Sequence, residues 1–107
     1  MSFICNNFFC GLEFYFITKT LVKAQHKILV ERIRTFDGIV SKNLSENTTH
    51  IICPRGMTYK TALTALNISM RLKDTVPFQF VNIDWLPACI AQKKLVPTTD
   101  FEVSSIF

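Results

Sequence analysis

Basic side chains recur between residues 19 and 34 at a spacing that places them on one face of a helix. Cations that a rigid helix presents together can bind DNA phosphates or an acidic protein surface. The alternative interpretation is an ordinary solvated helix face, partly neutralised by Glu31. The candidate cations are Lys19, Lys23, Lys27 and Arg34, with His26 beside them.

No group of side chains in the sequence matches a catalytic site. His50 follows Thr49, but no paired nucleophile or carboxylate comes at a usable spacing. Asp74, Asp84 and Asp100 fall in separate elements, without the paired aspartates that two-metal chemistry needs. We therefore expect no enzyme activity, no metal site and no cofactor. The alternative from another class, a small α/β enzyme or redox protein, would need a glycine-rich loop, a carboxylate cluster or a low-pKa cysteine.

Four cysteines leave both disulfides and free thiols open. Cys53 and Cys89 lie in apolar contexts, where a free thiol behaves as a small hydrophobic side chain. Cys5 and Cys10 are close in sequence, but no histidine or second close cysteine pair completes a zinc site. We expect reduced, structural thiols, which suit the cytosol or the nucleus.

Length and composition indicate one globular domain over residues 1–107. The chain is 49% hydrophobic, with ten phenylalanines and only three glycines, so it can bury a single core without disulfides or metal ions to stabilise it. Its net charge of +4 is compatible with an acidic partner, although a local patch matters more than this modest total. Residues 2–17 are apolar but too interrupted to span a bilayer, and we expect no membrane association.

Strands and helices alternate along the chain, which favours a central, mainly parallel sheet covered on both faces. The expected strands cover residues 12–17, 39–40, 49–53 and 78–81, and the later helices begin near residues 58 and 85. The first helix should end at Gly38, and Arg32 should reach the surface from within its apolar stripe. The tail should pack through Phe101 and Phe107. The apolar stripe of the first helix consists of Leu21, Val22, Ile28, Leu29, Ile33 and Phe36.

The only tryptophan, Trp85, stands at the start of the last expected helix. Leu86, Cys89 and Ile90 follow it at helical spacing, and Asn82 or Asp84 is positioned to cap the helix. A large aromatic side chain in this context is expected to anchor the core rather than to bind a ligand.

Together and in this order, these features resemble the BRCT domain, a small module of DNA-repair proteins. The resemblance extends from about residue 8 to residue 101. It is carried by the aromatic first strand, the Gly38 helix end, the Thr49–His50 pair and Trp85. It implies an α/β fold with a four-stranded parallel sheet flanked by three helices, two on one face and one on the other.

A narrower likeness, in residues 56–63, 95–96 and 105–107 and in Phe101, is to the BRCT domain of family X DNA polymerases. In that family the domain docks the polymerase onto DNA ends held by Ku and the end-joining ligase complex. The resemblance implies a non-catalytic recruiting module in the nucleus, active in double-strand-break repair by non-homologous end joining, with weak binding to duplex DNA ends. We expect a monomer. The binding residues expected are Lys19, Lys23, His26, Lys27, Leu29 and Arg34.

The sequence departs from the BRCT domains that bind phosphopeptides. Those domains use a Ser/Thr-Gly pair after the first strand and a lysine in the second helix. Thr18 can supply the hydroxyl, but Lys19 stands where the glycine would be and Leu63 falls near the expected lysine. A phosphopeptide-binding module of a DNA-damage checkpoint scaffold therefore remains the alternative function.

Overall fold

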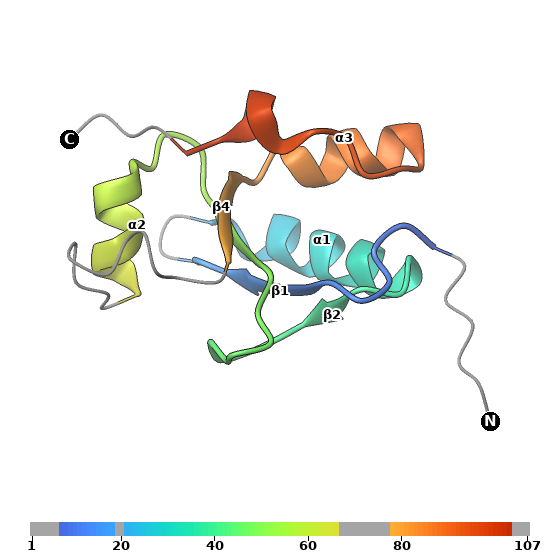
Figure 1. Cartoon of the computed structure of the whole chain (residues 1–107), viewed down its shortest axis with the longest axis horizontal. Coiled ribbons are helices and arrows are strands. Elements are labelled where there is room, and N and C mark those ends of the chain that lie inside the picture. Colours follow the sequence, from blue (N-terminus) through green and yellow to red (C-terminus); the bar gives the residue numbers. More distant parts are fainter. Residues whose placement is uncertain (1–6, 19–20, 67–77, 104–107) are drawn as a thin grey trace.

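Four parallel strands form one central sheet in the computed structural model, which describes residues 7–18, 21–66 and 78–103 (Figure 1). The strand order is β2 (Ile39–Val40), β1 (Glu13–Phe16), β3 (His50–Cys53) and β4 (Gln79–Asn82). Each neighbouring pair runs parallel, and Ile51 of β3 lies in register between Tyr15 of β1 and Phe80 of β4. The expected sheet is thereby confirmed, with β2 at the predicted residues.

Helices cover both faces of the sheet, as the sequence predicts. Side chains of α1 (Lys23–Thr35) and α3 (Trp85–Gln92) share one hydrophobic cluster with Phe14, Phe16, Ile52 and Val81 of the strands. Side chains of α2 (Tyr59–Ala65) pack on the opposite face, against Ile51, Cys53 and Phe80. Consecutive strand residues such as Ile51 and Ile52 are both fully buried, because a parallel sheet between two helical layers has no solvent face.

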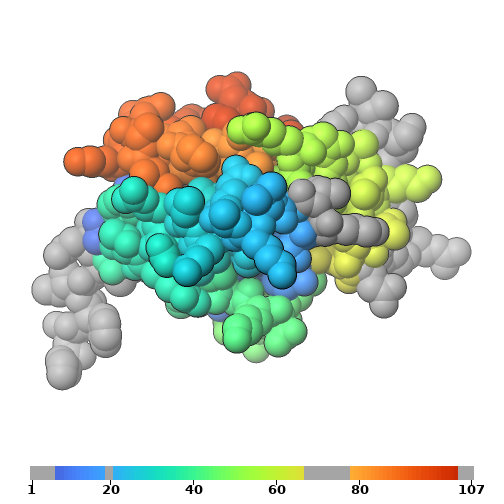
Figure 2. Space-filling model, turned by 180° about the vertical axis from the view of Figure 1, so that it is seen from behind, coloured from blue at the N-terminus to red at the C-terminus, as the bar shows by residue number. Residues whose placement is uncertain are grey.

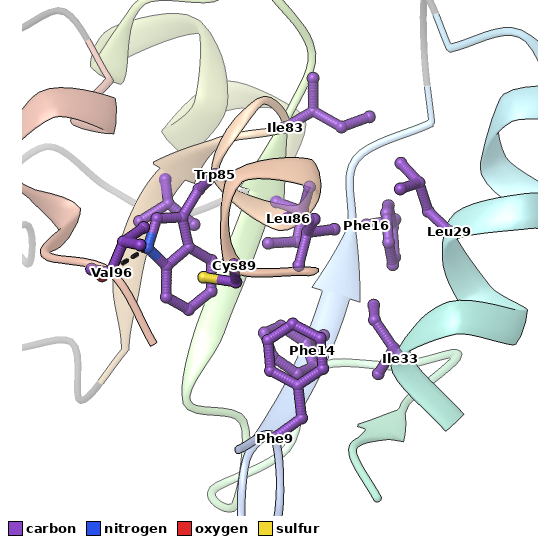
Figure 3. Close-up of a cluster of buried hydrophobic side chains, with 12 residues drawn as sticks. Phe9, Phe14, Phe16, Leu29, Ile33, Ile83, Trp85, Leu86, Cys89 and Val96 are labelled. Atoms are coloured by element: carbon purple, nitrogen blue, oxygen red, sulfur yellow. Dashed lines mark hydrogen bonds between the residues drawn. The ribbon is translucent and has the colours of Figure 1, made fainter. Parts of the chain in front are cut away.

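Trp85 anchors the larger of the two clusters (Figure 3). Its side chain is 1% exposed, with its ring centroid 6.3 Å from that of Phe9 and 6.2 Å from that of Phe14. The indole Nε1–H donates a hydrogen bond of 2.9 Å to the carbonyl oxygen of Val96, which satisfies its one buried polar atom. The expectation that Trp85 belongs to the core is confirmed.

The start of α3 differs from the expected cap. Asp84 precedes the helix, but its side chain makes no capping hydrogen bond. Its carboxylate instead accepts two hydrogen bonds from the Nε–H of Arg55, at 2.8 and 3.0 Å, and forms an ion pair with the same guanidinium. The side-chain oxygen of Asn82 accepts from the backbone N–H of Asp84 at 2.9 Å and closes the turn before the helix.

α1 ends in a Schellman motif. Gly38 is required there because a side chain would not fit, and not because of its backbone conformation. Asp37 takes the left-handed conformation, with φ of 70°. The backbone N–H groups of Asp37 and Gly38 donate to the carbonyls of Arg34 and Ile33, at 3.1 and 2.9 Å. A Cβ on Gly38 would lie 2.5 Å from Cγ2 of Ile33 and 3.0 Å from Cβ of Phe9. The predicted end of the helix at Gly38 is confirmed, and close packing explains why this residue is a glycine.

The buried stripe of α1 is narrower than expected. Leu29 and Ile33 are the only buried residues of α1, whereas the side chain of Ile28 is 56% exposed and that of Val22, just before the helix, is 64% exposed. Arg32 is exposed, as predicted. One apolar row is sufficient because this helix lies on the sheet beside α3, so its outer half meets solvent.

The cysteines do not all behave as expected. Cys53 and Cys89 are free and buried, in agreement with the prediction of structural thiols. Cys10 is disulfide-bonded, so the expectation of four reduced thiols is wrong. Cys5 lies outside the described residues.

The tail packs on the sheet edge through a short 3₁₀ helix, η2 (Thr98–Phe101). Phe101 packs against the larger cluster, as predicted, and Glu102 forms an antiparallel bridge with Val81 of β4. Phe107, which was also expected to pack, lies outside the described residues. Within the described ranges, every helix is too short or too polar to cross a membrane.

Candidate interaction surface

Three cations lie along one exposed row of α1. Lys23, Lys27 and Arg34 are separated by four and seven residues, and a helical rotation of about 100° per residue places them within one narrow arc. All three side chains are exposed. Figure 2 shows α1, in cyan, across the middle of one face of the molecule. Within the described part of the chain, none of the three forms an ion pair.

The other predicted binding residues are placed differently. His26 is half-buried and packs edge-on against the ring of Phe16, with 4.8 Å between ring centroids. Leu29 is 5% exposed and lies in the core, so it cannot contact a partner while the domain is folded. Its inclusion in the binding set is therefore corrected. Lys19 lies outside the described residues.

Sequence reasoning missed one cation that the fold places near this helix. Lys42 follows β2 and lines the same groove as His26 and Arg34 of α1. The signal for it is topological: parallel strands end at the same edge of a sheet, so the residue after β2 comes close to the residues after β1.

His50 is half-buried, and its contacts are those of a structural residue. Its ring stacks on that of Trp85, with 5.0 Å between centroids and an interplanar angle of 12°. The hydroxyl of Thr49 donates to the carbonyl of Glu13, so its oxygen can only accept from Nδ1–H of His50, at 2.8 Å. The neutral ring therefore carries its proton on Nδ1. Burial lowers the pKa of His50 below its ordinary value.

We expect the stability of the domain to fall as the pH drops below about 6.5, the ordinary pKa of histidine. Because burial lowers the pKa of His50 in the folded state, the unfolded chain takes up this proton more readily. Stability is therefore full at higher pH and declines on acidification. Urea unfolding at several values between about pH 7.5 and 5.5 measures this decline, and His50→Gln should flatten it. An equally steep decline in the variant would assign the effect to other groups.

Reactive thiol chemistry does not fit the two free cysteines. Burial raises the pKa of Cys53 to about 12 and also raises the pKa of Cys89. A nucleophilic or redox-active cysteine requires the opposite shift, since the thiolate is the reactive form. Within residues 7–18, 21–66 and 78–103, no three side chains of the metal-binding types come together.

The residues expected for phosphate binding are incomplete. Thr18 is exposed beyond the end of β1, but Leu63 of α2 is fully buried in the smaller hydrophobic cluster. An aliphatic side chain in the core offers neither a charge nor a donor to a phosphate group. This geometry argues against the phosphopeptide alternative.

A family model of the BRCT domain matches residues 7–102. The likeness to family X polymerases is expected to be strongest to DNA polymerase lambda, and a likeness to that protein is confirmed. The chain is 33% identical to DNA polymerase lambda of Rattus norvegicus over 84 residues, which are 78% of this chain and 14% of the polymerase. The chain thus spans a small part of that relative.

Solved BRCT domains share the fold. The C-terminal BRCT domain of human XRCC1 has a TM-score of 0.72 at 19% identity, over 97% of this chain and 100% of that one. The second XRCC1 BRCT domain has a TM-score of 0.69 at 18% identity, over 91% and 90% of the two chains. Rad4 BRCT1,2 in complex with a Crb2 phosphopeptide has a TM-score of 0.62 at 12% identity, over 89% and 46%.

Proposed function

The chain belongs to the BRCT domain family, a family of interaction modules, and from this we propose that it recruits a family X DNA polymerase to DNA ends in non-homologous end joining. The domain itself is non-catalytic, and the parent protein is a DNA-directed DNA polymerase of the nucleus. Similarity to polymerase lambda over 78% of the chain supports the choice of parent. The partners proposed are Ku, the end-joining ligase complex and, weakly, duplex DNA ends.

The observation that carries the proposal is the exposed cationic row of α1, formed by Lys23, Lys27 and Arg34. These side chains stand on one rigid helix, and within the described residues none of them forms an ion pair. Helix-borne cations of this kind suit the phosphate backbone of DNA or an acidic protein surface. Two other basic residues do not belong to this row. Arg32 of α1 lies outside the arc, and Arg55 is paired with Asp84.

We expect Lys23→Glu/Lys27→Glu to weaken recruitment without unfolding the domain. Both side chains are exposed, so each substitution should change the free energy of unfolding by less than about 0.5 kcal/mol. Binding to labelled duplex ends, alone and loaded with Ku, is measured by fluorescence anisotropy at several salt concentrations. If these lysines bind phosphates, the slope of log affinity against log salt should become shallower by roughly 0.9 for each phosphate that is no longer neutralised.

A matched control keeps the same change in charge on other faces. Lys60→Glu/Lys94→Glu reverses two exposed lysines, one on α2 and one after α3. This control should bind as the unchanged domain does. If Lys23→Glu/Lys27→Glu loses binding to Ku-loaded ends but keeps its binding to duplex ends without Ku, the cationic row contacts protein. Equal binding by all three proteins, with unchanged circular dichroism, would show that the row is only a solvated helix face.

A further inference from the structure

A groove of about 340 Å³ lies beside the cationic row of α1. Three segments that are distant in sequence form it: the end of β1, one side of α1, and the end of β2 with the two residues after it. His26, Val30 and Arg34 are spaced one turn apart, so a single row of α1 makes one wall along its length. Arg34 therefore belongs both to this wall and to the cationic row, whose other two members, Lys23 and Lys27, do not line the groove.

The floor of this groove is apolar. Phe16 is 5% exposed, and Val30 and Val40 are half-buried against the larger hydrophobic cluster. The ring of His26 packs edge-on against Phe16 and also lines the groove. The floor can therefore cover one apolar side chain of a ligand, and such burial contributes roughly 25 cal/mol for each Å² removed from water.

The rim of the groove is cationic. Arg34 stands on one side and Lys42 on the other, both exposed, and Thr18 and Ser41 add hydroxyl groups. Neither cation forms an ion pair within the described part of the chain, and the described residues that line the groove include no acid. By contrast, the guanidinium of Arg55 forms an ion pair with Asp84.

We propose that this groove binds a short acidic segment of a partner protein, with one apolar side chain on the floor and carboxylates at Arg34 and Lys42. A DNA backbone would leave the apolar floor unused, and a phosphate group alone would do the same. The proposal deepens the proposed function, since it names the chemistry of the protein partner that the domain meets beside α1. It places the peptide contact on different residues from Lys23 and Lys27.

The test uses a short fluorescein-labelled peptide of aspartate and glutamate residues around one central leucine. Two matched peptides carry serine in place of the leucine, or asparagine and glutamine in place of the acids. The unchanged domain should bind the first peptide best. Arg34→Glu/Lys42→Glu should weaken this binding by at least about tenfold, as expected from the removal of two exposed ion pairs and from new repulsion. Lys60→Glu/Lys94→Glu should bind as before.

The outcomes separate this proposal from the recruitment proposal. Lys23→Glu/Lys27→Glu should keep most peptide binding even where it loses binding to Ku-loaded DNA. No peptide binding by the unchanged domain, or equal binding by Arg34→Glu/Lys42→Glu with an unchanged circular dichroism spectrum, would overturn the groove proposal alone. Equal affinity for the leucine and serine peptides, with displacement by duplex DNA, would also overturn it, because the site would then hold any polyanion.

Discussion

Replacing Trp85 with alanine should cost about 3–5 kcal/mol in the free energy of unfolding, enough to unfold much of a domain of this size. The side chain is 1% exposed and contacts Phe9 and Phe14, so its removal leaves a cavity in the larger cluster. It also strips the stacking partner from His50 and leaves the carbonyl of Val96 without its donor. Both effects add to the cost of the cavity.

Urea unfolding followed by far-ultraviolet circular dichroism measures this change in stability, since the variant has no tryptophan fluorescence. Lys94→Ala, at an exposed position after the same helix, is the control and should change stability by less than about 0.5 kcal/mol. A decrease below about 1 kcal/mol for Trp85→Ala would contradict its place at the centre of the core.

Gly38→Ala should destabilise the domain by about 1–3 kcal/mol, the usual cost of forcing atoms into a filled core. The added methyl group would lie 2.5 Å from Cγ2 of Ile33 and 3.2 Å from its carbonyl oxygen. Ile33 is fully buried, so it has little room to move away. Thermal or urea unfolding of the purified variant and of the unchanged domain measures this difference in the free energy of unfolding.

Asp37→Gly is the matched control for this helix end. Asp37 has a φ of 70°, which glycine adopts without a steric penalty. Its carboxylate accepts only an exposed hydrogen bond from Asn7, so stability should change little or rise. If Asp37→Gly costs more than Gly38→Ala, the helix end depends on the Asp37 side chain and not on close packing at Gly38.

The sheet was predictable because its signals are local. The short apolar pair Ile39–Val40 follows a glycine, and the apolar run to Cys53 ends at a proline, so both strands are bounded by residues that break regular structure. A run that is apolar at every position also indicates burial on both faces, which the parallel sheet provides. Trp85 stood out as the only tryptophan beside a buried strand.

The errors lie where distant segments meet. Asp84 looked like a helix cap, but Arg55, far away in sequence, takes its carboxylate. Gly38 was predicted only as the end of the helix, and the reason for a glycine there, close packing against Ile33, could not be read from the sequence. The disulfide of Cys10 was missed for another reason, because the sequence leaves both disulfides and free thiols open.

The binding surface was predictable only in part, for the same reason. Helical spacing identifies Lys23, Lys27 and Arg34 as one row, but it does not say which apolar neighbours of α1 face the sheet. Leu29 was expected both in the apolar stripe and among the binding residues, but it is buried in the core, whereas Ile28 of the same stripe is 56% exposed. Lys42 approaches α1 only because β2 pairs in parallel with β1.

The central claim, that α1 presents the docking surface, is tested most directly by nuclear magnetic resonance of the ¹⁵N-labelled domain. Unlabelled Ku bound to duplex DNA ends is added in small steps, and the broadening of each backbone amide signal is recorded. The amides of Lys23, Lys27 and Arg34, with their neighbours on the exposed side of α1, should broaden first. Broadening that begins in α2 or around Arg55, with α1 unaffected, would contradict the account and place the docking surface on another face.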